Sequence, residues 1–196
     1  MTVKQLTILV DMDDCIEDLS VAWVDYLNTM YGTTVAHSEL KEWDMTKAFP
    51  ELTAQQVYGV LEDPALWANV SPLPGAVKYV RKLIEDGNQV FICTASQPNT
   101  IATKLSLVLF RYFPYLRPED VIVANRKQMI KGDILIDDGF HNFGGQPMGF
   151  LFTANHNKSI TDEELSKVNA VRVNNWKEAY DLIHNFQTHF KTGGIQ

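Results

Sequence analysis

The sequence predicts an α/β protein built around a parallel sheet, for three reasons. Six short apolar runs are rich in β-branched or aromatic residues, as expected of strands. The first four show little polar alternation, which is typical of strands covered on both faces. Helical patterns lie between the runs, and alternating strands and helices favour a parallel sheet with right-handed crossovers. The expected strands are residues 6–10, 89–93, 121–123, 134–136, 150–152 and 170–173.

Helical patterns connect these strands. Residues 75–86 begin after Pro74, and proline is well tolerated in the first turn of a helix. Residues 100–113 and 176–190 carry two more helical patterns. About 75 residues separate the first strand from the second, far more than one crossover helix requires.

That long gap contains three further helical patterns, at 19–31, 38–49 and 53–61. We therefore expect a small α-helical cap domain at residues 17–72, inserted after the first strand and lying above the sheet. The core domain then comprises residues 1–16 and 73–196.

Composition and charge exclude several classes of partner. The net charge is −7, so no basic excess is available to bind a nucleic acid polymer or an anionic membrane. No stretch approaches the roughly 18 apolar residues of a membrane span, and the N-terminal apolar run is too short for a signal peptide. Cys15 and Cys93 are too few for a disulfide framework, so we expect reduced thiols and a cytoplasmic protein.

Two acids, Asp11 and Asp13, follow the first strand directly. Burying a carboxylate is costly unless it is paired or binds a metal, and ligands bind at the carboxyl ends of strands in open α/β sheets. A solvated turn is the simpler alternative. A calcium-binding EF-hand loop is excluded, because Cys15 and Ile16 stand where an acid or amide and a glycine are needed.

Three more polar features lie at or near strand ends. Thr94 closes the second strand and Ala95 follows it, Lys104 lies in the next helical pattern, and Asp137 and Asp138 close the fourth strand. Alone, each has an ordinary explanation: a β-forming threonine, a solvated lysine, an acidic loop. Their ordered occurrence at successive strand ends predicts a catalytic site.

The order of these motifs resembles that of the haloacid-dehalogenase-like (HAD) phosphatases, from residue 6 to about 185. The segments VDMDD, PLPGAVKYVRKL, ICTAS and DILIDD are most similar to the 5'(3')-deoxyribonucleotidases. The resemblance implies a Rossmann-like parallel sheet with helices on both faces and a cap. It also implies magnesium-dependent hydrolysis of small phosphomonoesters through an aspartyl-phosphate intermediate, with deoxyribonucleoside monophosphates as substrates.

The resemblance also implies a role for each site residue. Asp11 is the nucleophile and Asp13 the general acid–base. Asp11, the backbone carbonyl of Asp13 and Asp138 hold Mg²⁺, and Asp137 supports these ligands from behind. The expected phosphate-binding residues are Thr94, Ala95, Lys104 and Lys127. Because dehalogenases lack the second acid, Asp13 disfavours carbon–halogen chemistry.

The sequence departs from the family at two positions. Asp14 stands where relatives usually have glycine, and Leu19 where animal members carry a phenylalanine that packs against the base. We expect Leu19, Trp43 and Trp67 to line the substrate pocket, although tryptophans in a small helical unit are more often core residues.

Several alternatives stay open. The substrate could be another metabolite such as a sugar phosphate. The chain could also be a non-catalytic nucleotide-binding regulatory protein, which Asp14 favours. A homodimer is neither indicated nor excluded. The five histidines lack metal-ligand spacing and are interpreted as structural or solvated, with His141 nearest to the site.

Overall fold

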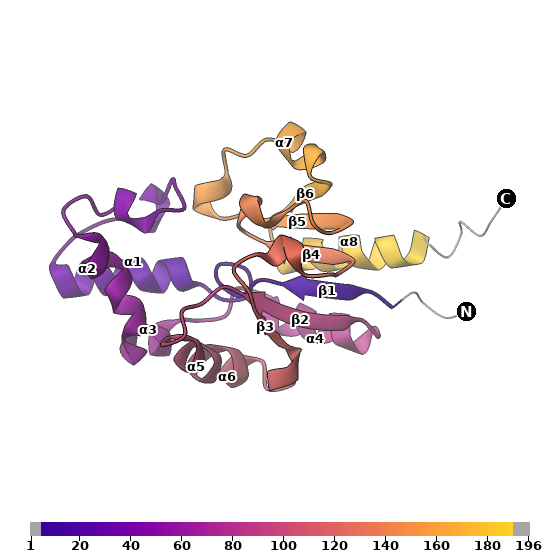
Figure 1. Cartoon of the computed structure of the whole chain (residues 1–196), viewed down its shortest axis with the longest axis horizontal. Helices are drawn as coiled ribbons and strands as arrows, with labels where there is room; N and C mark the ends of the chain where they lie inside the picture. Colours follow the sequence, from indigo (N-terminus) through magenta and orange to yellow (C-terminus); the bar gives the residue numbers. More distant parts are fainter. Residues whose placement is uncertain (1–4, 190–196) are drawn as a thin grey trace.

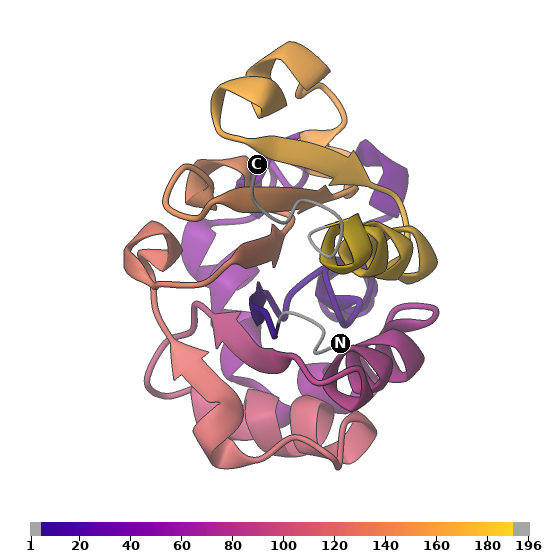
Figure 2. The ribbon, with the colours of Figure 1, turned by 90° about the vertical axis from the view of Figure 1, so that its right-hand side faces the viewer.

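The computed structural model describes residues 5–189 and contains one parallel sheet of six strands in the order β3-β2-β1-β4-β5-β6 (Figures 1 and 2). The strands are β1 (Thr7–Val10), β2 (Gln89–Thr94), β3 (Val121–Val123), β4 (Ile134–Asp137), β5 (Met148–Phe152) and β6 (Ala170–Val173). β1 lies between β2 and β4, with Ile8 opposite both Val90 and Ile134. The predicted parallel α/β fold is confirmed.

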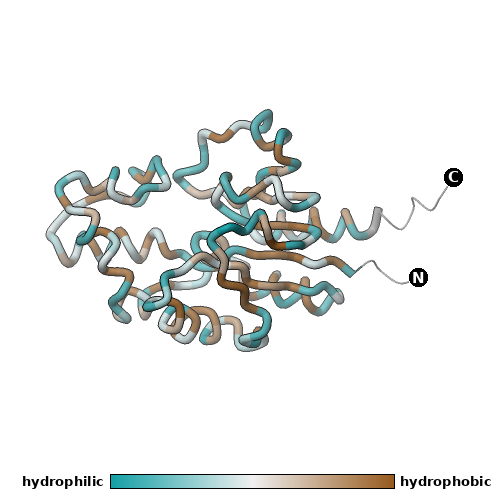
Figure 3. The backbone as a smooth tube through the Cα atoms, in the orientation of Figure 1, coloured by the Kyte–Doolittle hydropathy of each residue, from teal (hydrophilic) through white to brown (hydrophobic). Residues whose placement is uncertain are grey.

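Both faces of the central strands β1 and β4 are buried, as their continuous apolar residues predict. The edge strand β3, which was also expected to be covered on both faces, is only partly buried, and its Val123 is 52% exposed. Ile8 and Val10 pack into one cluster with residues of α4 (Ala76–Glu85) and α8 (Trp176–His189), which lie together on one side of the sheet in Figure 2. Leu9 packs on the opposite face. Figure 3 shows hydrophobic residues running along β1 and β2, which the rest of the core surrounds. The face of the sheet that bears Leu9 is covered by α7 (Asp162–Lys167) and by neighbouring loops.

The segment after β2 is less regular than the expected single helix over 100–113. It consists of α5 (Ile101–Lys104), a π-helical stretch η4 (Leu105–Leu109) and α6 (Phe110–Tyr112). Local π geometry inside helices is frequent at functional sites. Here it begins directly after Lys104, one of the predicted site residues.

The long gap between β1 and α4 forms a helical unit at one end of the molecule (Figure 1). Its elements are α1 (Leu19–Tyr31), η1 (His37–Glu39), η2 (Met45–Lys47), α2 (Ala54–Gly59), η3 (Val60–Glu62) and α3 (Pro64–Asn69). The expected helix at 38–49 is wrong, because the Asp44 side chain accepts the backbone N–H of Thr46 at 3.0 Å and starts a separate turn. Helix α3 was not expected, although Asp63 and Pro64 are a favourable helix start.

The remaining short helical turns are η5 (Pro118–Asp120), η6 (Lys127–Met129), η7 (Phe140–Asn142) and η8 (Asn155–Asn157). Three of these, η6, η7 and η8, follow strand ends, and each contributes polar side chains to the lining of one cavity. Within residues 5–189, no helix has the length and apolar character needed to cross a membrane.

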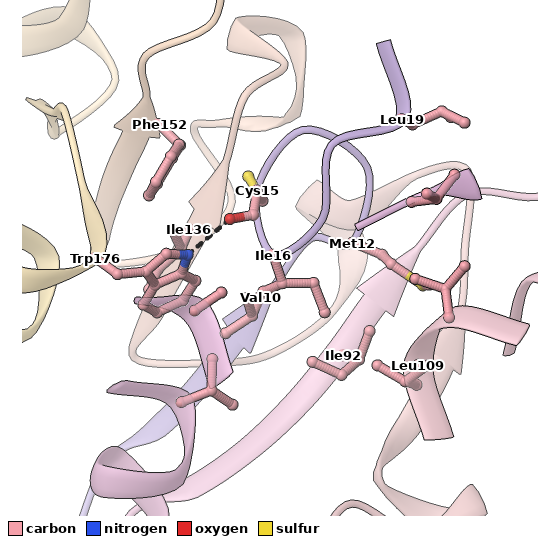
Figure 4. Close-up of a cluster of buried hydrophobic side chains, with 14 of the residues drawn as sticks. Val10, Met12, Cys15, Ile16, Leu19, Ile92, Leu109, Ile136, Phe152 and Trp176 are labelled. Atoms are coloured by element: carbon pink, nitrogen blue, oxygen red, sulfur yellow. Dashed lines mark hydrogen bonds between the residues drawn. The ribbon is translucent and has the colours of Figure 1, made fainter. Parts of the chain in front are cut away.

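Trp176 of α8 contacts the loop after β1 and holds it against the core. Its indole Nε1 donates a hydrogen bond to the backbone carbonyl of Cys15 at 2.7 Å, and its ring packs against Phe152 with centroids 5.9 Å apart. Figure 4 shows this cluster, in which Val10 and Ile16 lie beside the indole. The loop that bears the predicted catalytic acids therefore rests on the main core.

Replacing Trp176 by phenylalanine should lower the free energy of unfolding by about 1–3 kcal/mol, because the buried carbonyl of Cys15 loses its donor. Urea denaturation followed by fluorescence or circular dichroism measures the change. Leu182→Ala, at a partly exposed position of the same helix, serves as the control and should change stability by less than about 0.5 kcal/mol. Equal effects of the two substitutions would contradict this account.

Candidate active site

The central strands β1 and β4 bring three acids together. The backbone N–H of Asp11 donates to the carbonyl of Ile136 at 2.8 Å, which sets the end of β1 beside the end of β4. Asp11, Asp137 and Asp138 are 4%, 0% and 1% exposed, respectively. Three buried carboxylates at one point require compensating positive charge or protons.

Lys127 supplies part of that charge. Its ammonium lies between Asp11 and Asp137, 2.6 Å from Oδ1 of Asp11 and 2.8 Å from Oδ2 of Asp137. Although burial alone would lower the pKa of Lys127, the two carboxylates raise it above its usual value. The other oxygen of Asp137 accepts hydrogen bonds from the N–H of Gly139 and the Asn142 side chain. Asp137 therefore holds Lys127 in place.

The pKa of Asp11 is raised although Lys127 lies beside its carboxylate. Burial and the charge of Asp137 raise the pKa of Asp11 to about 7. Its Oδ1 also accepts the backbone N–H of Met12 at 2.6 Å. This carboxylate is thus firmly oriented and is sensitive to any cation placed near it.

Lys104 plays the corresponding part for Asp13. Its ammonium is 2.6 Å from Oδ2 of Asp13 and donates to Oγ1 of Thr94 at 2.7 Å. Burial would raise the pKa of Asp13, but the charge of Lys104 and the hydrogen bonds to the carboxylate outweigh it and lower the pKa. The lysine also lies over the ring of Trp67, 5.8 Å from the ring centroid. Thr94, Lys104 and Asp13 thus form one connected group.

A buried glutamate stands behind Asp13. Glu17 is 0% exposed, and burial together with the charge of Asp13 raises its pKa well above the usual value. Burial therefore favours the neutral form of Glu17. Glu17 could not be identified from the sequence, because only the turn after β1 brings it to the site.

Asp138 differs from the other acids in its contacts. Oδ2 lies 3.2 Å from Nε2 of His156, whereas Oδ1 is buried and has no hydrogen-bond partner within residues 5–189. Burial, followed by the charge of Asp11, raises the pKa of Asp138 well above its usual value. Burial lowers the pKa of His156, so the imidazole is neutral and provides no compensating charge.

Asp14 occupies a backbone conformation that suits glycine. Its φ of 51° lies in the left-handed region, which favours glycine. Its Oδ1 accepts the backbone N–H of Ser20 at 3.0 Å, so the acid also supports the start of α1. Burial raises the pKa of Asp14 to about 7.

These acids form two groups that could hold a metal ion. In each group, one ligand atom from each residue lies within 4.8 Å of the others: Asp11, Asp137 and Asp138 in the first group, and Asp14, Asp138 and His156 in the second. Asp138 belongs to both. Oxygen ligands of this kind suit hard divalent cations.

A cavity above the acids is lined by residues of both the helical unit and the core. Leu19, Trp23, Leu40, Trp43, Met45 and Tyr58 contribute its apolar and aromatic walls, and Ala95, Asn125, Lys127 and His141 contribute from the core. Trp43 is 56% exposed and its ring meets those of His141 and His156 edge-on, at centroid distances of 5.2 and 4.8 Å. The helical unit therefore touches the core across the cavity.

The structure brings all the sequence-predicted site residues to one region. Asp11, Asp13, Lys127, Asp138, Ala95, Leu19 and Trp43 line the cavity, and Trp67 lines an adjoining hollow with Lys104 and Thr100. Asp137 and Thr94 lie beneath it, bound to the two lysines. Trp67 is buried and contacts Lys104, so it shapes the site from below the surface.

Besides Glu17, two polar residues of the site were missed by sequence reasoning. His156 had been interpreted as structural or solvated, but it contacts Asp138, and Asn125 lines the cavity. Both follow strands, β5 and β3. The rule that identified Asp11 and Asp138, polar residues just beyond a parallel strand, applies to them too and was the available signal.

Comparison with known families gives one match that spans most of the chain. The family model described as "5' nucleotidase, deoxy (Pyrimidine), cytosolic type C protein" matches residues 4–189. A 5'(3')-deoxyribonucleotidase of Bacillus subtilis is 32% identical over 173 residues, which cover 87% of this chain and 94% of that protein. One from Clostridium acetobutylicum is 27% identical over 184 residues, covering 92% and 96%.

Solved structures show the same fold at low sequence identity. A haloacid dehalogenase-like protein from Agrobacterium tumefaciens superposes with a TM-score of 0.61 at 17% identity, covering 95% of this chain and all of that one (100%). A HAD family hydrolase from Deinococcus radiodurans, solved with bound phosphate and sodium, gives 0.60 at 13% identity, covering 95% and 98%. The resemblance predicted from the sequence is confirmed.

The raised pKa of Asp14 predicts how its replacement by asparagine depends on pH. The pKa is about 7 in the folded chain and about 3.9 in the unfolded chain, so the folded chain binds more protons between these values. The contribution of Asp14 to stability is therefore present below about pH 4 and is lost as pH rises through about 7. An asparagine side chain cannot ionise, and asparagine tolerates a positive φ.

Asp14→Asn should thus become progressively more stable than the wild type from about pH 4 to about pH 7. Denaturant unfolding in the presence of a chelator measures this difference. Glu163→Gln, at an exposed position of α7, should show no such trend. A difference between wild type and Asp14→Asn that is constant across this pH range would refute the assignment.

Proposed function

The chain belongs to the 5' nucleotidase, deoxy (pyrimidine), cytosolic type C family, and we propose that it removes the phosphate of deoxyribonucleoside monophosphates through Asp11. Nucleotidases hydrolyse phosphoric monoesters, so the predicted enzyme class is confirmed. One observation carries the proposed mechanism. A buried, oriented carboxylate at the end of β1 lies beside a second acid, with one buried lysine contacting each of them.

In the proposed reaction, an oxygen of Asp11 attacks phosphorus, and the bond from phosphorus to the nucleoside oxygen breaks. Lys104 lowers the pKa of Asp13 in the free chain, so this step requires Asp13 to be protonated once the substrate is bound. Asp13 then donates that proton to the leaving oxygen, which departs as the nucleoside hydroxyl. Asp13 then takes a proton from water, and the water oxygen attacks the phosphorus of the aspartyl phosphate. The bond from Asp11 to phosphorus breaks, so inorganic phosphate leaves and both acids return to their starting states.

The two lysines suit this chemistry because of what they already contact. Lys104 bridges Asp13 and Thr94, and Lys127 bridges Asp11 and Asp137. Each ammonium can therefore bind a phosphoryl oxygen without leaving its carboxylate. Charge neutralisation and positioning account for most of the catalysis of phosphoryl transfer. The main chain at Ala95 lines the same cavity and completes the proposed phosphate site.

The residues fit a magnesium ion. Asp138 has a buried oxygen without a partner within residues 5–189, beside the carboxylate of Asp11. We propose that Asp11, the carbonyl of Asp13 and Asp138 hold Mg²⁺, whereas Asp137 is engaged by Lys127 and two further donors. A bound Mg²⁺ would offset the repulsion between the carboxylates and the phosphate dianion.

The proposed base-binding region is the aromatic wall that the helical unit contributes to the cavity. We propose that residues 17–72 act as a cap domain over a core of residues 1–16 and 73–196. Leu19, Trp43 and Tyr58 of the cap line the cavity, and an exposed aromatic ring is suited to stack on a nucleobase. A cytoplasmic location stays a prediction from the sequence, which leaves the oligomeric state open.

Phosphate release from a panel of deoxyribonucleotides, ribonucleotides and sugar phosphates, with and without Mg²⁺, tests the proposal. We expect release from deoxyribonucleotides that requires Mg²⁺, and we expect Asp11→Asn to lower kcat by about 10⁴-fold or more, because the nucleophile is lost. Asp25→Asn, at an exposed position of α1, is the control and should match the wild type.

The same panel separates the alternatives. Release from sugar phosphates alone would replace the substrate class and keep the mechanism. Binding of nucleotides without release from any compound would favour the regulatory protein. Wild-type rates in Asp11→Asn would refute the covalent mechanism.

Trp43→Ala should raise KM for deoxyribonucleotides by about 5- to 150-fold, the range that corresponds to about 1–3 kcal/mol of lost stacking. KM for 2-deoxyribose 5-phosphate, which has no aromatic ring to stack, should change far less. Met30→Ala, exposed on the outer side of the cap, is the matched control. Equal increases for both substrates would show that Trp43 acts on the phosphate site instead.

A further inference from the structure

A second set of metal-ligand atoms lies beside the proposed magnesium position. Asp14, Asp138 and His156 each offer one ligand atom, and these atoms lie within 4.8 Å of one another. The three residues come from the loops after β1, β4 and β5, which are far apart in the sequence. All three line the same cavity, so the group is open to ions from solvent.

The contacts of Asp138 allow it to serve two positions. Oδ2 is 3.2 Å from Nε2 of His156, whereas Oδ1 is buried and has no hydrogen-bond partner in the described part of the chain. A carboxylate can bridge two divalent cations about 3.5–4 Å apart, as in two-metal hydrolases.

The positive charges of the site are committed elsewhere. Lys127 contacts Asp11 and Asp137, and Lys104 contacts Asp13. Within residues 5–189, no lysine or arginine makes an ion pair with Asp14 or Asp138. A ligand atom of each acid lies within 4.8 Å of one from the other and of one from His156. A cation is the simplest group that would balance them.

We propose that Asp14, Asp138 and His156 bind a second divalent cation, a transition-metal ion such as Mn²⁺, Co²⁺ or Zn²⁺. The imidazole nitrogen distinguishes this set from the all-oxygen magnesium position, because nitrogen ligands favour transition metals over Mg²⁺. The magnesium position rests on the proposed function, whereas this second set does not require the chain to turn over substrate.

Cobalt(II) is a suitable probe, because bound Co²⁺ can be counted and its visible spectrum reports a nitrogen ligand. The full chain, kept in Mg²⁺, is dialysed against Co²⁺, and bound metal is measured by elemental analysis. We expect Co²⁺ to bind this second set in the wild type. In Asp14→Gly and His156→Gln its affinity should fall by at least about tenfold, and His156→Gln should change the visible spectrum.

Two features make the variants interpretable. Glycine suits the positive φ at position 14, so Asp14→Gly should fold, and circular dichroism with thermal unfolding checks this. His141→Gln is the matched control, because His141 also meets the ring of Trp43 but belongs to neither ligand group. It should bind Co²⁺ like the wild type.

Wild-type Co²⁺ affinity in both Asp14→Gly and His156→Gln would overturn the proposal, as would the absence of Co²⁺ binding beside saturating Mg²⁺. Either result would leave the proposed phosphatase standing, since release of phosphate in Mg²⁺ alone is measured separately. Conversely, an inactive protein that binds Co²⁺ through these residues would refute the function and keep the second cation site.

Discussion

The balance of buried charge at the ends of β1 and β4 is the constraint on which the rest of the site depends. Lys127 is almost fully buried between Asp11 and Asp137, and its ammonium is held by both. Removing one member of such a group leaves an uncompensated charge away from water, which is strongly destabilising. The orientation of the proposed nucleophile is therefore inseparable from the folding of the segment that carries Lys127.

The parallel register of the sheet creates this arrangement from distant parts of the chain. Val10 pairs with Ile136, so the next residue on each strand, Asp11 and Asp137, emerges at the same edge. The neighbouring strand β2 ends at Thr94, which places the hydroxyl where Lys104 can reach both it and Asp13. Neither lysine lies on a strand. The short helical segments α5 and η6 supply the two lysines, and the sheet positions the acids.

The sheet and the main acids were predictable from the sequence because apolar strands and polar strand ends are local signals. Asp11 and Asp138 could be found in this way. The pairing of Lys127 with two particular carboxylates could not, because it depends on how η6 packs against the sheet. The predicted helix at 38–49 was wrong, because the Asp44 side chain competes with a helix for backbone hydrogen bonds. His156 was missed because a single histidine has no spacing pattern.

Asp14 links the stability of the fold to its proposed chemistry. The residue adopts a positive φ and adds a carboxylate beside four other acids, so both its backbone and its charge oppose folding at neutral pH. The same repulsion favours any cation that binds among these acids, because binding relieves a penalty already present in the folded chain. Glycine at this position would remove both effects at once. Keeping Asp14 lowers the free energy of unfolding when no cation is bound and increases the stabilisation when one binds. Such a trade of stability for binding is expected where binding a cation is part of the protein's function.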